Sequence, residues 1–255
     1  MRKIAIVGFS QRSREDAPFD DPTFEIWGMN NLHAVLPGKR FTRWYDIHSR
    51  EYLDLNNKNL QTDHVEWLRT TKIPVYMLRE YKEFPTSLPY PLEDVQDMMR
   101  TELGFQGDED RYLHSTPAMA LAHAVLEGVD EVEIYGCDMV VDLEWGYQRA
   151  NMEAWVTLAR QLPALSGGKI KVTVAQNCAL LKGMGLYAYD AGAYSFMLKV
   201  EDTLRSIKHE AETKKQDAES ERFQKQVQMN TFDGSRQAME HALEIIAQMK
   251  RGYQV

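Results

Sequence analysis

The fold is decided by residues 114–138, HSTPAMALAHAVLEGVDEVEIYGCD. Ser115 or Thr116 followed by Pro117 predicts a helix start, because proline is tolerated where the first N–H groups of a helix lack partners. Small apolar residues then predict a tightly packed helix, and Gly128 is well placed to end it. The run EVEIYGC predicts a β-strand that leads into Asp138. Together they predict a helix and strand of a parallel α/β sheet.

Five more short runs rich in β-branched or aromatic residues predict strands. They cover residues 3–9 (KIAIVGF), 24–29, 43–48, 74–78 and 170–175. The first is nearly continuous in apolar residues, which is typical of a strand buried on both faces of a parallel sheet. Helical segments lie between the runs. We therefore expect an α/β fold, with a mostly parallel sheet of about six strands flanked by helices.

The composition changes after about residue 193. Residues 199–225 hold seven basic and seven acidic residues but neither Gly nor Pro, and residues 200, 204, 207 and 211 form a narrow apolar seam. The sequence NTFDG at 230–234 predicts a break. We expect an α/β domain at 1–192 and a C-terminal α-helical hairpin at 193–255. We expect this antiparallel hairpin to project from the α/β domain. A helix packed along the parent domain and a homo-oligomer formed through the seam are the alternatives.

Composition excludes several classes of protein. The 255 residues are 44% hydrophobic and 27% charged, as in a folded chain, and the net charge of −8 argues against a general nucleic-acid coat. Cys137 and Cys178 lie in apolar runs and are expected to be reduced thiols. No run approaches the ~18 apolar residues of a membrane span, and residues 1–11 lack a signal-peptide cleavage site. We expect a cytoplasmic protein without membrane association.

Polar residues follow the first predicted strand, at the end where open α/β sheets bind ligands. Gly8 allows close backbone approach, and Ser10, Arg12, Ser13 and Arg14 supply donors suited to phosphate. A solvated polar loop is the competing interpretation. A G-x-G-x-x-G fingerprint and a G-x-x-x-x-G-K-[ST] loop are both missing from the sequence, which disfavours NAD enzymes and P-loop kinases.

The next two strand ends are also polar. Asn30 and Asn31 either form a turn or donate and accept hydrogen bonds with a base and a ribose. Alternation places Asp46 and His48 on one face, where they are either ligand-binding groups or only a polar strand end. Two such residues are too few for a metal site, and we expect none.

The helix start and the strand after it converge on the same sheet edge. Ser115 and Thr116 bring hydroxyls and helix N-terminal N–H groups, which suit an anion, although capping alone explains one of them. Gly136 and Asp138 end the following strand. A polar and aromatic cluster then enters the next helix, where an ordinary surface pair is the competing interpretation: Glu144, Tyr147, Gln148 and Arg149.

The order of these motifs resembles a Rossmann-like group of proteins. The motifs are G-F-S, W-G-M-N-N, Y-D-I-H, S-T-P-A-M-A-L-A, I-Y-G-C-D and Y-Q-R, spread over about residues 3–190. The group includes sialyltransferase-type glycosyltransferases, Maf-type flagellin glycosylation proteins and archaeal pterin pyrophosphokinases. Small proteins with this pattern also occur in bacteriophages, in which case the cytoplasm would be that of the host cell.

The resemblance implies that residues 1–192 form a Rossmann-like nucleotide-binding domain, with a mostly parallel sheet, and that a nucleotide or nucleotide-sugar binds across the strand ends. It implies phosphate contacts from the first turn and the helix start, ribose or base contacts from the asparagines, and a sugar or phosphate near Asp138. The full set of expected nucleotide-binding residues is Gly8, Ser10, Arg12, Arg14, Asn30, Asn31, Asp46, Ser115, Thr116, Gly136, Tyr147 and Gln148.

Two departures from the group bear on the chemistry. The turn G-F-S-Q-R-S-R replaces the group's G-x-G-P-S-L. The sialyltransferase-type enzymes have a histidine base downstream of their G-x-D element, whereas residues 138–168 contain no histidine. Asp138, Glu144 or the more distant His48 or His114 must then act as the base in any transfer reaction.

The favoured function is a transferase with a nucleotide-activated donor, specifically a glycosyltransferase that acts by direct displacement. Its candidate catalytic residues are Asp138, Glu144 and His48. A nucleotide-binding or sequestering protein without turnover is one alternative. Another is a phospho- or pyrophosphotransferase, the only version that calls for Mg²⁺, held by Asp138 with Asp142 or Glu144. A structural role is the last alternative, and sugar, protein and nucleic acid stay open as acceptors.

Overall fold

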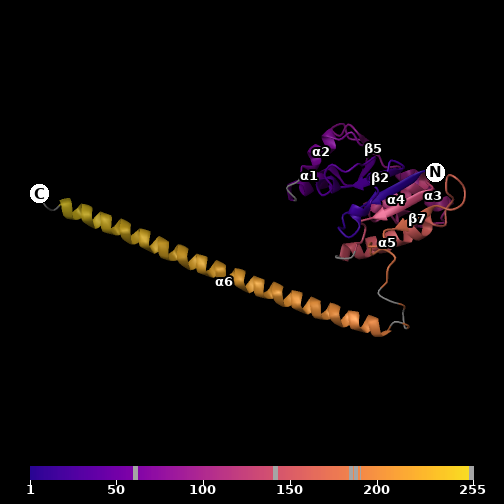
Figure 1. The fold of residues 1–255 in the computed structure, drawn as a ribbon. Helices are drawn as coiled ribbons and strands as arrows, with labels where there is room; N and C mark the ends of the chain where they lie inside the picture. The colour runs from indigo at the N-terminus through magenta and orange to yellow at the C-terminus, as the bar shows by residue number, and fades with distance from the viewer. Residues whose placement is uncertain (60–62, 140–142, 184–185, 187–188, 190, 253–255) are drawn as a thin grey trace. The chain divides into compact units, whose positions relative to one another are not determined.

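The computed structural model describes residues 1–255 except 60–62, 140–142, 184–185, 187–188, 190 and 253–255. The chain divides into two compact units, Met1–Lys182 and Gly183–Val255. Figure 1 shows the strands and shorter helices of the first unit and the long helix of the second.

Seven parallel strands form one sheet in the order β5-β4-β3-β2-β1-β6-β7. They are β1 (Lys3–Val7), β2 (Phe24–Met29), β3 (Arg43–Asp46), β4 (Val75–Met77), β5 (Ser87–Pro89), β6 (Glu131–Tyr135) and β7 (Lys171–Val174). In the register of the sheet, Lys3 of β1 lies between Phe24 of β2 and Glu131 of β6. The predicted α/β fold with a parallel sheet is confirmed.

All six predicted strands are present, and β5 is a seventh that was not predicted. It has three residues, lies at the edge of the sheet and ends at Pro89. Proline cannot donate a hydrogen bond to a neighbouring strand and is therefore found in edge strands. So short a segment shows no alternation by which the sequence could reveal it.

Helices and 3₁₀ turns connect the strands. They are η1 (Arg14–Asp16), η2 (Leu32–Ala34), α1 (Arg50–Asn59), α2 (His64–Thr70), α3 (Leu92–Thr101), η3 (Gly107–Arg111), α4 (Thr116–Leu126) and α5 (Leu143–Ala159). α4 starts where predicted, because Ser115 is its N-cap and accepts a hydrogen bond from the Ala118 N–H at 3.3 Å. Such a cap contributes about 0.5–2 kcal/mol to stability.

Alternate residues of the central strands enter two separate apolar cores. In β1, Ile4 and Ile6 pack in the core that includes α3, α4 and α5, while Ala5 and Val7 pack in the core that includes α1 and α2. Full burial of an aliphatic side chain stabilises a fold by about 1.5–3 kcal/mol. Burial on both faces explains the continuous apolar run of the first strand.

The strand order reverses between β1 and β6. The chain adds β2, β3, β4 and β5 on one side of β1 and places β6 and β7 on the other side. In open α/β sheets such a switch point leaves a crevice outside the carboxyl ends of the strands, and ligands bind there.

The second unit contains one continuous helix, α6 (Ala191–Gly252), of 62 residues. The predicted hairpin is therefore wrong, because Asn230 and Gly234 lie inside this helix. A glycine inside a helix costs only about 1 kcal/mol, which neighbouring turns can offset. Ion pairs between residues four positions apart lie on either side of Gly234 in α6. The charged groups are 2.6 Å apart in the pair of Glu210 and Lys214 and 3.4 Å apart in the pair of Arg236 and Glu240. Within the described part of the chain, no helix is both long enough and apolar enough to cross a bilayer.

Candidate functional site

A cavity of about 770 Å³ opens at the carboxyl ends of β1, β2, β3 and β6. Its volume lies in the range of small-molecule sites. The sequence-predicted site residues in its lining are Gly8, Ser10, Asn30, His48, His114, Ser115, Thr116, Gly136, Asp138 and Gln148. The remaining lining residues are Phe9, Met29, Ile47, Tyr52, Leu113, Pro117, Met119, Cys137 and Met139.

The two arginines after β1 lie outside this lining. Arg12 is exposed. The guanidinium of Arg14 donates to the Phe9 carbonyl at 2.7 Å and pairs with Glu15 at 3.5 Å, so that it stabilises the turn. None of the described residues that line the cavity is a lysine or an arginine. The predicted role of these two arginines in phosphate binding has no support from their placement.

Two other predicted residues, Asn31 and Tyr147, are not among the described residues of the lining. Asn31 caps η2. Tyr147 is exposed on α5, with its ring centroid 5.9 Å from that of His114. The side chain of Glu144, like residues 140–142, lies outside the described part.

Two backbone N–H groups of the turn after β1 donate hydrogen bonds to the end of β6 and the residue that follows it. The Gly8 N–H donates to the Tyr135 carbonyl and the Ser10 N–H donates to the Gly136 carbonyl, both at 2.8 Å. The buried Ser13 hydroxyl accepts from the Gly136 N–H at 2.9 Å. Ser13, expected to donate to phosphate, instead ties the two strand ends together.

The start of α4 offers fewer donors than the sequence implies. Pro117 has no N–H, and the Ala118 N–H is bonded to Ser115. Thr116, which lines the cavity, therefore brings its N–H and its hydroxyl as the main donors of this helix end.

Two buried oxygens in the lining lack a hydrogen-bond partner among the described residues: Asn30 Oδ1 and Asp138 Oδ2. The Asn30 backbone is held in place, since its N–H donates to the Tyr45 carbonyl and its carbonyl accepts from Trp44 Nε1, both at 2.9 Å. Asp138 Oδ1 accepts from the Ala179 N–H at 2.6 Å. An unpaired buried acceptor costs about 1–3 kcal/mol. Two in one cavity therefore favour a ligand with hydroxyl or amino donors.

Asp46 lies outside the lining, directly behind one of its histidines. The carboxylate is fully buried, and its Oδ1 lies 2.6 Å from His48 Nδ1. Its Oδ2 lies 2.6 Å from Nε2 of His64, the first residue of α2. Burial alone would raise the pKa of Asp46, but the hydrogen bonds from His48 and His64 outweigh it and hold that pKa below its ordinary value.

His64 and its neighbour His33 are the polar residues that sequence reasoning missed. His64 Nδ1 lies 2.9 Å from Nε2 of His33 in η2, and the His33 ring stacks on Trp67 with centroids 4.5 Å apart. The two histidines stand 31 residues apart in the sequence. No local motif relates them to Asp46.

Two other kinds of site, a cysteine nucleophile and a metal centre, find little support among the described residues of this cavity. Burial raises the pKa of Cys137 well above its ordinary value, which keeps it a thiol rather than a nucleophilic thiolate. Among the described residues, no group of three or more His, Cys, Asp or Glu side chains is arranged to hold a metal ion. The Mg²⁺ site expected for a phosphotransferase involves residue 142 and the Glu144 side chain, which lie outside that part.

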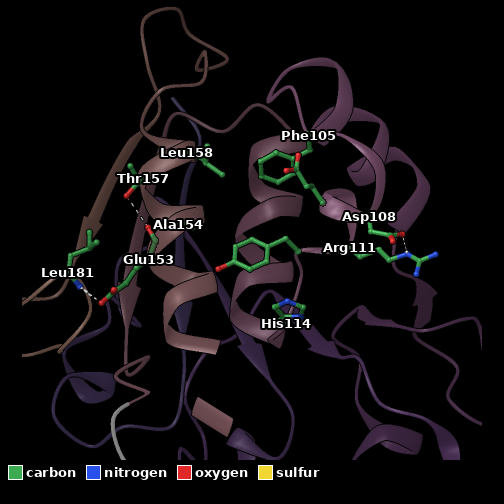
Figure 2. A pocket seen from close by; sticks show the side chains of 11 residues that line it. Phe105, Asp108, Arg111, His114, Glu153, Ala154, Thr157, Leu158 and Leu181 are labelled. Carbon is green, nitrogen blue, oxygen red and sulfur yellow. Dashed lines mark hydrogen bonds and ion pairs between the residues drawn. The ribbon is translucent and has the colours of Figure 1, made fainter. Parts of the chain in front are cut away.

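A second cavity of about 740 Å³ lies between η3 and α5, and Figure 2 shows its lining residues. His114 lines both cavities. Two carboxylates of the second cavity have partners: Glu153 Oε1 accepts from the Leu181 N–H at 2.9 Å, and Asp108 pairs with Arg111 at 3.5 Å. None of the unpaired buried atoms found in the described residues lines it. The cavity at the strand ends is therefore the candidate site.

Comparisons with known proteins give a distant structural likeness. No family model matches the chain, and no curated protein matches its sequence. The sialyltransferase CstII from Campylobacter jejuni with CMP-3FNeuAc is 12% identical over 78% of this chain and 99% of that chain, with a TM-score of 0.41. CstII with a trisaccharide acceptor and CMP is 11% identical over 77% and 99%, with a TM-score of 0.37.

At this level of likeness, the ligands and activity of CstII cannot be transferred to this chain. Sialyltransferase-type glycosyltransferases are one of the groups that the sequence motifs resemble. The flagellin-glycosylation group, the pterin group and the link to bacteriophages stay predictions.

Proposed function

We propose that the cavity at the strand ends binds a nucleotide or a nucleotide-activated sugar, and that the protein is a glycosyltransferase-like transferase. The observation that carries the proposal is the pair of unpaired buried acceptors, Asn30 Oδ1 and Asp138 Oδ2, in one cavity at the switch point. Ribose, sugar and base all present hydroxyl or amino donors, which satisfy such acceptors.

The charges of the lining favour a donor with one phosphate. Thr116 and Ser115 supply hydroxyl and N–H groups, but no lysine or arginine belongs to the described lining, and Asp138 adds a carboxylate. A diphosphate would bring more negative charge into a cavity with few groups to stabilise it. We expect a nucleoside monophosphate, or a sugar linked to one, to bind more tightly than its diphosphate counterpart.

The reaction is direct displacement. A hydroxyl of the acceptor attacks the sugar carbon that bears the phosphate while a base in the cavity takes the hydroxyl proton. The bond between that carbon and the phosphate oxygen breaks, and its electron pair leaves with the phosphate. Hydrogen bonds from Thr116 stabilise the departing charge. A binding protein without turnover would use the same cavity and is distinguished by the absence of product.

Calorimetry with a panel of ligands tests the proposal. The panel contains cytidine, uridine, guanosine and adenosine mono- and diphosphates and their sugar derivatives. We expect saturable binding of at least one, weakened about tenfold or more by Asp138→Asn, because the amide replaces an acceptor by a donor. Asp20→Asn, at an exposed carboxylate, is the matched control. Absence of saturable binding by every ligand overturns the proposal, and so does equal binding by the two variants.

A further inference from the structure

A buried carboxylate joins two imidazoles behind the cavity. Asp46 is the last residue of β3, and its two oxygens lie 2.6 Å from His48 Nδ1 and 2.6 Å from His64 Nε2. Such short distances are typical of hydrogen bonds to an ionised acceptor. The contacts hold the carboxylate from both sides and fix its orientation.

The protons of this network can be assigned from its partners. An ionised carboxylate only accepts, so His48 must donate its Nδ1–H and His64 its Nε2–H. His33 Nε2 lies 2.9 Å from His64 Nδ1, so in the neutral form of both rings the His64 Nδ1 lone pair accepts from the Nε2–H of His33. Burial and the neighbouring His64 lower the pKa of His33 to about 4, which keeps it neutral at pH 7. In this arrangement the ring N–H groups of His48, His64 and His33 are all directed along the hydrogen-bonded network toward Asp46.

The assignment leaves one lone pair at the cavity. With its proton on Nδ1, neutral His48 has an unprotonated Nε2 at the opposite edge of the ring from Asp46. The ring lines the cavity and stacks on Tyr52, with centroids 4.5 Å apart. Within the described part of the chain, no hydrogen bond to His48 Nε2 is found. A lone pair in this position is what a general base requires.

We infer that His48 is the general base of the cavity, that Asp46 sets its tautomer, and that His64 is a positioning residue which holds Asp46. Only the nature of the reaction rests on the proposed function. His48 Nε2 takes the proton of the acceptor hydroxyl while the acceptor oxygen bonds to the sugar carbon. The nucleoside phosphate leaves with the electron pair. Protonated His48, stabilised by Asp46, then releases its proton to water.

Other titratable groups surround the network. Tyr52 of α1 stacks on His48, and Asp138 and His114 line the same cavity. Asp63 lies before α2, and its charge acts on His33. Of these, only Asp138 and His114 compete with His48 for the role of base, and each needs its own variant in the tests.

Nitrogen NMR of histidine-labelled full-length protein tests the network without any ligand. We expect neutral His48 to carry its proton on Nδ1, while His64 and His33 carry theirs on Nε2. Asp46→Asn can accept only one of the two N–H donors, so it should move His48 or His64 to the other tautomer. A neutral His48 with its proton on Nε2 in the wild type overturns the inference.

A pair of substitutions separates positioning from packing at His64. His64→Gln keeps an amide donor for Asp46, whereas His64→Leu removes it. We expect Gln to preserve the tautomer of His48 and Leu to disturb it, with His241→Gln on α6 as the unaffected histidine control. If both changes leave the His48 signals as in the wild type, the positioning role is wrong. If Leu does not fold, loss of the tautomer in His64→Gln still contradicts the role.

Turnover gives the final readout, with release of nucleoside phosphate from the sugar nucleotide that binds best in calorimetry. We expect His48→Gln to retain binding within about threefold and to lose most of kcat, as expected when a group acts only in the transition state. In a serine protease, Asp→Asn at the orienting carboxylate costs about 10⁴-fold in kcat, and a loss of similar kind is expected for Asp46→Asn. The assignment of His48 is overturned if His48→Gln retains kcat while His114→Gln or Asp138→Asn abolishes it. If no nucleotide binds but NMR gives the expected tautomers, the proposed function is wrong, whereas the arrangement of protons between Asp46 and the histidines is confirmed.

Discussion

Gly8 and Gly136 approach each other so closely that neither position has room for a side chain. A Cβ atom added to Gly8 would lie 2.6 Å from the Gly136 carbonyl oxygen, and one added to Gly136 would lie 2.5 Å from the Gly8 carbonyl oxygen. Gly136 also has φ +65°, in the left-handed region that favours glycine. The two residues follow β1 and β6, so this contact forms the floor of the crevice at the switch point.

Alanine in place of Gly8 or Gly136 is expected to destabilise the first unit of the chain, Met1–Lys182. The nearest atom that the new Cβ would meet is a backbone carbonyl oxygen, which cannot move aside as a flexible side chain does, so we expect Gly136→Ala to lower the free energy of unfolding by about 2–4 kcal/mol. Gly146→Ala in α5 is the control, because nothing lies within 4 Å of a Cβ there. It should leave stability unchanged or raise it by about 0.5–1 kcal/mol. Urea unfolding measures both, and equal effects of the two changes would contradict the contact.

Ser13→Ala tests the link between the same two turns. The change removes the hydroxyl that accepts from the buried Gly136 N–H at 2.9 Å. An N–H left unpaired in the interior costs about 1–3 kcal/mol, which urea unfolding should detect. Ser10→Ala, at a partly exposed hydroxyl, should cost less than about 0.5 kcal/mol. A stability of Ser13→Ala equal to that of Ser10→Ala would show that the bond to Gly136 contributes nothing.

The sequence was sufficient for six of the seven strands and for most of the cavity lining, because both follow from rules that act along the chain. Apolar runs predict the strands, and parallel strands bring their carboxyl ends to one edge, so Asn30, His48 and Asp138 were expected to meet. Arg14 was assigned to the ligand because its residue type suits phosphate. Whether its guanidinium reaches a ligand or the Phe9 carbonyl depends on the path of the turn, which the residue type does not determine.

The orienting network behind His48 could not be predicted from local patterns. His33 lies in a 3₁₀ turn and His64 begins a helix, and both positions are ordinary for histidine. Their connection to Asp46 arises only from the packing of η2, β3 and α2. The continuous helix α6 was missed for the opposite reason. The local signal of Asn230 and Gly234 is real, but its cost is small beside the gain from the long helix on either side.

His33 makes stability depend on pH. Its pKa is about 4 in the folded protein, below its ordinary value of 6.5. Between these values the unfolded chain binds a proton that the folded protein does not, so the free energy of unfolding should fall as the pH drops from 6.5 toward 4. Above pH 6.5 this histidine should contribute no pH dependence.

Urea unfolding at several pH values between 7.5 and 4.5 measures this effect. His33→Gln should flatten the decline, because the amide does not titrate. Keeping the pH at 4.5 or above avoids Glu127, whose pKa lies near 2: burial would raise it, but His123 and Arg43 hold it low. That carboxylate loses its stabilising effect only below its ordinary pKa of 4.5. An unchanged slope in His33→Gln would assign the decline to other groups.

The apolar seam of α6 predicts self-association with a second copy of the chain. Val200, Leu204, Ile207 and Ala211 follow heptad spacing, and the side chains of Leu204 and Ile207 are 60% and 57% exposed. Light scattering should give a mass at least twice the 29.5 kDa of one chain. Leu204→Glu combined with Ile207→Glu should reduce it to 29.5 kDa, because charges in the seam cannot be buried in a dimer. Ser206→Glu adds a charge beside the seam and should leave the larger mass intact. A wild-type mass of 29.5 kDa at every concentration would contradict the prediction and leave the i,i+4 ion pairs as the main support of the helix.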